Sequence, residues 1–76
     1  MHVVAKQNKP INYHIEELKV INNLSERTKK VCVNSSLDNL YKILGYHFRN
    51  RSFRQVRNCG EKTNNELQAM SDYYIR

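Results

Sequence analysis

The sequence predicts an all-α fold, a compact bundle of four to five short helices. Apolar residues recur at three- and four-residue steps, the spacing that places them on one face of a helix. Residues that favour helix N-caps stand in front of these runs. No stretch of useful length alternates apolar and polar residues as a half-buried strand would. The 76 residues are enough for one domain with one core.

Residues 1–12 are predicted to form a flexible arm, and residues 13–76 a single helical domain. Pro10 disfavours helical backbone at the residue before it and is compatible with the start of structured chain. The first helix is expected within residues 15–21, where two glutamates suit the positive end of a helix dipole. Two consecutive asparagines, residues 22–23, are expected to end it.

The second and third helices each follow a residue that can cap them. Ser25 can cap a helix that runs to Val31 or Cys32, with Leu24 in the position of a hydrophobic staple. Ser36 ends a short polar loop and is expected to cap the third helix, which the sequence supports best. The apolar face of that helix is predicted to consist of Leu37, Leu40, Tyr41, Leu44 and Phe48.

The last helix is predicted to follow a basic loop and a glycine turn. Phe53 and Val56 can share one face of a helical turn in the loop, and Gly60 permits a positive φ or a close backbone approach. Thr63 fits the N-cap of the last helix with Glu66 completing a capping box, although the helix can also begin one or two residues earlier. The inward side chains of this helix are expected to be Leu67, Met70 and Tyr74.

The charge balance points to polyanionic partners. Thirteen Lys and Arg against seven Asp and Glu give the chain a formal charge of +6. On a small body this favours DNA, RNA or acidic proteins, although a basic balance also serves solubility alone. The densest basic stretch interleaves with Phe48 and Phe53, both predicted to lie in the core. Its arginines, expected to belong to a binding field, are Arg49, Arg51, Arg54 and Arg57.

Several classes of function are disfavoured by what the sequence lacks. Cys32 and Cys59 are predicted to be small core side chains in a reducing cytosol rather than a disulfide. Together with His14 and His47 they match no zinc spacing, so neither metal nor cofactor is expected. No nucleophile with a base, no P-loop and no paired carboxylates are evident, so we expect no enzyme and no small-molecule substrate. Without an apolar leader or a long apolar run, we expect a cytoplasmic protein that does not enter membranes.

Two segments carry a resemblance to a known family. Residues 24–28 read LSERT and are followed by VC at 31–32. Residues 53–63 read FRQVRNCGEKT and are followed by EL at 66–67. The pair resembles the C-terminal domain of the bacterial RNA polymerase alpha subunit, where a helix opening L-[ST]-x-R-[ST] precedes a turn N-x-G-x-K-[ST]-x-x-E-[IL]. The resemblance extends over residues 24–74.

The resemblance implies a helix-hairpin-helix-like fold in which the two segments face each other and bind the DNA backbone around the minor groove. Physical chemistry agrees, because Gly60 would allow close approach to a helix N-terminus, Thr63 a hydroxyl contact and Lys62 a point charge. Arg27 would enter a narrow A·T-rich minor groove, and Glu66 would orient it or close a capping box. The predicted DNA-binding residues are Arg27, Lys30, Arg57, Gly60, Lys62, Thr63 and Glu66.

Three features depart from the family pattern. Lys30 stands where the family usually has asparagine. About five extra residues fall within 44–52, where they either lengthen the third helix or form a loop. The large domain that assembles polymerase is missing, so we expect an excised domain or a free-standing relative.

The sequence therefore predicts a transcription-related DNA-binding module of low sequence specificity that favours A·T-rich duplex and contacts phosphates and the minor groove. The alternative is a protein-interaction module that docks on a transcription factor or RNA polymerase and has little DNA affinity. Strongly salt-dependent duplex binding favours the first, and recovery of a specific acidic protein after nuclease treatment favours the second.

Overall fold

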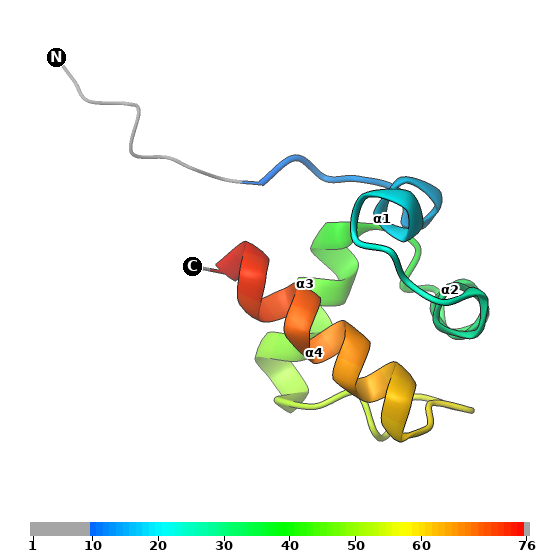
Figure 1. The fold of residues 1–76 in the computed structure, drawn as a ribbon. Coiled ribbons are helices and arrows are strands. Elements are labelled where there is room, and N and C mark those ends of the chain that lie inside the picture. The colour runs from blue at the N-terminus through cyan, green and yellow to red at the C-terminus, as the bar shows by residue number, and fades with distance from the viewer. Residues whose placement is uncertain (1–9, 76) are drawn as a thin grey trace, which may run out of the picture.

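The computed structural model describes residues 10–75, which contain four short helices joined by turns and loops (Figure 1). No strand of a sheet occurs within this range, so the predicted all-α fold of four to five helices is confirmed. The helices are α1 (Ile15–Ile21), α2 (Glu26–Asn34), α3 (Leu40–Asn50) and α4 (Glu61–Ile75).

The helix α1 lies where the sequence predicts it and is held at its start by a reciprocal cap. Nδ1 of His14 accepts from the backbone N–H of Glu16 at 3.1 Å, and Oε1 of Glu17 accepts from the backbone N–H of His14 at 2.9 Å. A helix of 7 residues is too short to be stable alone, so these bonds and its packing hold it in place.

The chain before α1 is joined to the start of α3. The backbone N–H of Leu40 donates to the Tyr13 carbonyl at 2.8 Å. The Tyr41 hydroxyl donates to the Pro10 carbonyl, also at 2.8 Å. The end of the predicted arm therefore contacts α3, whereas residues 1–9 lie outside the described residues.

Of the N-caps predicted for the second and third helices, the first is confirmed and the second is wrong. The Ser25 hydroxyl accepts from the backbone N–H of Thr28 at 3.2 Å and caps α2 as expected. Ser36 instead lies in a turn with a φ of 62°, and Asn39 caps α3 by accepting from the N–H of Lys42 at 2.9 Å. The physical reason is that asparagine caps as well as serine does, and the chain first turns to bury the leucine that precedes α3.

Most of the segment 44–52, which the sequence left open as helix or loop, is helical. The helix α3 continues to Asn50 and ends where Arg51 adopts a φ of 63°. Residues 44–50 therefore belong to the third helix.

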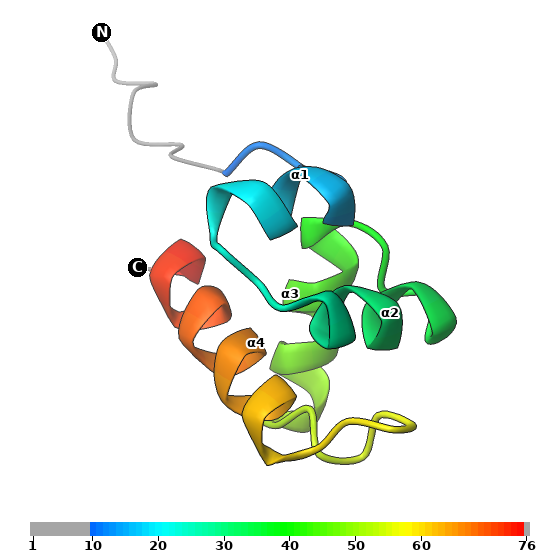
Figure 2. The same cartoon turned by 45° about the vertical axis from the view of Figure 1, so that its right-hand side comes forward.

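The core lies between α4 and the other helices. The helix α4 packs against α3 along one side and against α2 near its start, and α1 packs against α2 (Figure 2). The buried apolar side chains are Ile15, Leu18, Leu24, Val31, Cys32, Leu37, Leu40, Ile43, Leu44, Phe53, Val56, Leu67 and Met70.

The two phenylalanines of the arginine-rich stretch have opposite environments. Phe53 is fully buried, which confirms its predicted place in the core. Phe48 is 61% exposed, so the prediction that it belongs to the core is wrong. The reason is helical register, because at about 100° per residue Phe48 and Tyr41 lie a quarter turn or so around α3 from the buried Leu40.

The loop between α3 and α4 is anchored by its own aromatic residue. The ring of Phe53 stacks against those of Tyr46 and His47, at centroid distances of 5.6 and 5.9 Å. The Phe53 backbone N–H donates to Oδ1 of Asn64 at 2.8 Å, so α4 holds the loop directly. This anchoring fixes the approach of the loop to the start of α4.

Both cysteines are free thiols, and Cys32 lies in the core as predicted. Burial, with a smaller contribution from the nearby Cys59, raises the pKa of Cys32 to about 12. The Cys32 thiol is therefore protonated at neutral pH and packs as a small apolar group. Among the described helices, none combines the length and the apolar content needed to cross a bilayer.

Candidate nucleic-acid interface

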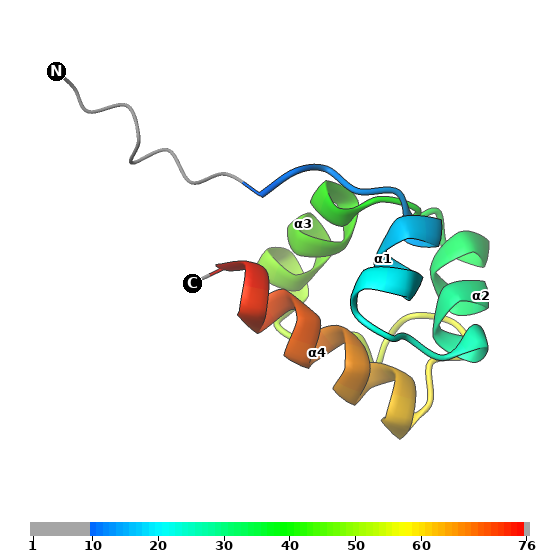
Figure 3. The ribbon, with the colours of Figure 1, turned by 45° about the horizontal axis from the view of Figure 1, so that its top comes forward.

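The starts of α2 and α4 lie side by side (Figure 3), and hydrogen bonds that involve the Glu66 carboxylate and the Thr28 hydroxyl join them. Oε1 of Glu66 accepts from the backbone N–H of Ser25 at 3.0 Å and from the Thr28 hydroxyl at 2.6 Å. The hydroxyl oxygens of Thr28 and Thr63 are 3.3 Å apart and buried. The Glu66 carboxylate of α4 thus completes the N-cap of α2. In an ordinary capping box, this carboxylate comes from the helix that is being capped.

The Glu66 carboxylate, which together with Thr28 and Thr63 forms the buried joint between α2 and α4, is ionised at neutral pH. Burial alone would raise the pKa of Glu66, but hydrogen bonds from Thr28 and Ser25, with the charge of Lys62, hold it below its usual value. No hydrogen bond or ion pair joins Glu66 to Arg27 within the described residues. Glu66 therefore caps α2 from α4 and does not orient Arg27.

The helix α4 begins at Glu61, the earlier start that the sequence left open. Thr63 therefore lies inside the first turn, 1% exposed, and is not the N-cap. The predicted capping box is wrong, because its glutamate reaches across to α2. Gly60 occupies the cap position, its carbonyl accepting from the Asn64 N–H at 3.0 Å, and the positive φ of this turn, 64°, belongs to Asn58.

Each first turn directs a basic side chain outward beside a buried threonine. Arg27 precedes Thr28 and Lys62 precedes Thr63, and both basic residues are exposed. Because the two threonine hydroxyls meet, the backbones that carry these cations are fixed relative to each other. The two remaining basic residues of the predicted site, on α2 and in the loop before α4, are also exposed, namely Lys30 and Arg57.

The N-terminal end of α4 is open to solvent. Gly60 is exposed, and a Cβ added there would meet no atom within 4 Å. Within residues 10–75 no side chain caps the first N–H groups of this helix. The Glu61 carboxylate, which would repel an anion, is paired with Arg54 at 2.7 Å. Helix ends of this kind accept phosphate oxygens.

Two residues of this arrangement were not predicted from the sequence. Thr28 joins the two helices, and its signal was the repeated pairing of a basic residue with threonine at the start of both helices. Asn64 is 3% exposed and ties the loop to α4 through its side-chain oxygen. No sequence signal marks Asn64, because asparagine in a first helical turn is usually exposed.

The charges of this surface suit a polyanion. No cluster of three or more His, Cys, Asp or Glu side chains that could hold a metal ion occurs in the part of the chain described. No protein family, curated protein or solved structure matches the chain.

Proposed function

We propose that the chain binds duplex DNA through the α2–α4 basic face, a surface made of Arg27, Lys30, Arg57 and Lys62 with the open end of α4. The observation that carries the proposal is the buried joint of Thr28, Thr63 and Glu66. It fixes two helix starts that each present a cation to solvent, and therefore matches a ligand with regularly spaced negative charges.

Each part of this face has a distinct role in the proposal. The N–H groups at the open end of α4 receive one phosphate, and Lys62 adds a point charge beside them. Arg27 enters the minor groove, where A·T-rich sequence narrows the groove and strengthens its negative potential. Lys30 and Arg57 extend the contact along the backbone, so binding depends on charge and shape more than on base identity.

In this proposal, Thr63 and Glu66 do not contact DNA. They position the residues that do. The buried Thr63 hydroxyl and the hydrogen-bonded Glu66 carboxylate hold the two helix starts together. Support for DNA as the polyanion comes from the matched segments at 24–28 and 53–63, which resemble the C-terminal domain of the polymerase alpha subunit. The same resemblance makes a role in transcription part of the proposal.

The test is duplex binding by the double variant Arg27→Ala/Lys62→Ala. Affinity for an A·T-rich duplex is expected to fall on the order of 10- to 100-fold, because two cations that contact the DNA are lost. The slope of log K against log salt should shrink by about 2. Fluorescence anisotropy across a salt series, on A·T-rich and G·C-rich duplexes, measures both quantities.

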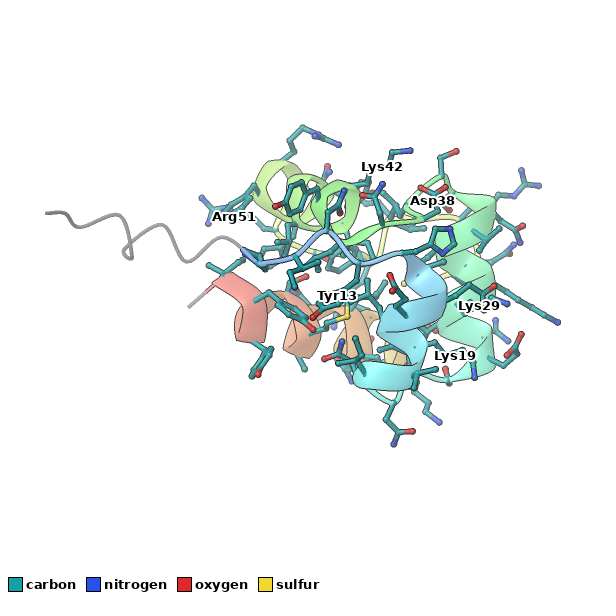
Figure 4. The ribbon with its side chains drawn as sticks, turned by 90° about the horizontal axis from the view of Figure 1, so that it is seen from above. Tyr13, Lys19, Lys29, Asp38, Lys42 and Arg51 are labelled. Carbon is teal, nitrogen blue, oxygen red and sulfur yellow. The ribbon has the colours of Figure 1, made fainter. Side chains whose placement is uncertain are left out.

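The matched control is Lys19→Ala/Lys42→Ala, which removes the same charge from α1 and α3, outside the α2–α4 basic face (Figure 4). Affinity and salt slope should change far less in this control than in the double variant of the basic face. An equal loss in the two variants would mean that net charge, not the α2–α4 basic face, determines binding. Absence of duplex binding at low salt would reject the proposal and favour the protein-interaction alternative.

A further inference from the structure

The outer face of α3 carries an apolar groove. We call it the α3 groove; it has a volume of about 310 Å³ and is lined by Pro10, Tyr41, Leu44, Gly45 and Phe48. Phe48 is 61% exposed and Tyr41 is 45% exposed, which is unusual for aromatic side chains of a small domain. These exposed apolar side chains, grouped around one groove, can contact another molecule.

A glycine and an arginine shape this groove. Gly45 leaves room between the two aromatic rings, because it has no side chain. A Cβ added at Gly45 would lie 3.4 Å from Nη1 of Arg49, so this guanidinium lies at the edge of the groove. Arg49 forms no ion pair within residues 10–75. The groove therefore favours a ligand that is apolar and carries a carboxylate.

A second exposed apolar surface has the opposite charge. We call it the α1 face; it lines a shallow hollow of about 410 Å³ and consists of Glu16, Glu17, Val20 and Ile21. Val20 is 80% exposed and Ile21 is 53% exposed. Glu16 is paired with Lys29 at 2.9 Å, whereas Glu17 bonds only a backbone N–H. The Glu17 carboxylate thus remains able to pair with an incoming cation.

We infer that the α1 face of one copy of this chain occupies the α3 groove of a second copy. The apolar side chains Val20 and Ile21 would cover the exposed rings of the groove, and Glu17 would pair with Arg49. At 1.5 Å per residue, the 7 residues of α1 span about 10 Å, the same distance that separates Tyr41 from Phe48 along α3. Both complementary surfaces belong to one chain, which favours a second copy over a foreign partner.

The contact joins two different surfaces, so it can repeat from copy to copy. Such a head-to-tail contact produces chains or rings rather than an obligatory dimer. Each surface involves only a few side chains, and the association is therefore weak. Neither surface includes a residue of the α2–α4 basic face, so the inference is independent of the proposed function.

Sedimentation velocity on nuclease-treated protein tests the inference at concentrations up to about 1 mM, the weak end of specific association. The wild-type chain should form species that grow with concentration. Phe48→Glu, which replaces one ring of the groove by a carboxylate, and Val20→Lys, which disrupts the α1 face, should each be monomeric. An equal mixture of the two variants should form dimers and nothing larger, because only one pair of intact surfaces remains.

Two further variants serve as matched controls for hydrophobicity and charge. Tyr73→Glu and Val33→Lys change residues that are also exposed, 63% and 47%, but lie on α4 and α2, and both should associate as the wild type does. If the wild-type chain stays monomeric at every concentration, the inference is overturned. Binding of an acidic peptide in place of self-association would overturn it as well. A monomeric mixture, or association of either single variant, overturns the pairing of these two surfaces.

Discussion

Replacing Phe53 by alanine is expected to lower the free energy of unfolding by about 3–5 kcal/mol. The ring is fully buried and stacked between Tyr46 and His47, so its removal leaves a cavity that the anchored loop cannot close. A domain of this size has a total stability of about 5 kcal/mol or little more, so the variant should be largely unfolded under mild denaturation. Urea titration followed by circular dichroism measures the loss.

Phe48→Ala is the matched control for this change. It removes the same side chain from a position that is 61% exposed, so the free energy of unfolding should fall by about 0.5 kcal/mol or less. If the two variants lost a similar amount of unfolding free energy, the burial of Phe53 and the exposure of Phe48 would be contradicted.

The second large effect is expected for Glu66→Ala, with a loss of about 2 kcal/mol in the free energy of unfolding. One carboxylate oxygen accepts from the Ser25 backbone N–H, the Ser25 hydroxyl and the Thr28 hydroxyl. Removing it leaves the Ser25 backbone N–H without its acceptor and leaves the two hydroxyls only each other and Thr63 as partners. Thermal unfolding should occur about 10 °C lower, because 1 kcal/mol corresponds to several degrees in a domain of this length.

Glu61→Ala controls for the loss of one negative charge near the start of α4. Glu61 forms an exposed ion pair with Arg54 at 2.7 Å, and exposed pairs of this type contribute little. The melting temperature should therefore change by a few degrees at most. A comparable drop in both variants would mean that charge, rather than the hydrogen bonds to α2, explains the effect of residue 66.

The pH dependence of stability should distinguish Glu66→Gln from the wild type. Because the pKa of the Glu66 carboxyl is lowered by folding, its stabilising effect is complete above the unfolded value of about 4.5. The effect is lost as the pH falls through the lowered folded-state pKa. The difference in unfolding free energy between the two proteins should therefore shrink from neutral pH to about pH 3. A difference that stays constant would contradict an ionised, hydrogen-bonded carboxylate.

The helical architecture follows from features that act within one or two turns. The pattern that predicted α1 combined apolar spacing with early glutamates, and Ser25 capped α2 through a bond to a residue three positions away. Such interactions need no knowledge of the rest of the fold. The burial of Leu67 and Met70 on α4 was also predictable, because their three-residue spacing places them on one face of the helix.

Two of the errors arose where burial or a hydrogen bond depends on residues far away in the sequence. Glu66 fitted a capping box with Thr63, but its carboxylate binds α2, whose Ser25 is 41 residues away. The apolar residues of α3 cover a wider face of the helix than the core can bury. The packing of α4 against this helix decides that Ile43 is buried and Phe48 is exposed. Local patterns cannot contain this information.

The two halves of the α2–α4 basic face come from distant parts of the chain and meet only through the buried joint. An unfolded chain therefore presents no such face, and any ligand that contacts both helix starts binds the native state alone. By thermodynamic linkage, that ligand raises the unfolding free energy by RT ln(1 + [L]/Kd). Occupancy and folding are then coupled, and a domain with little stability of its own gains resistance to denaturation whenever it is bound.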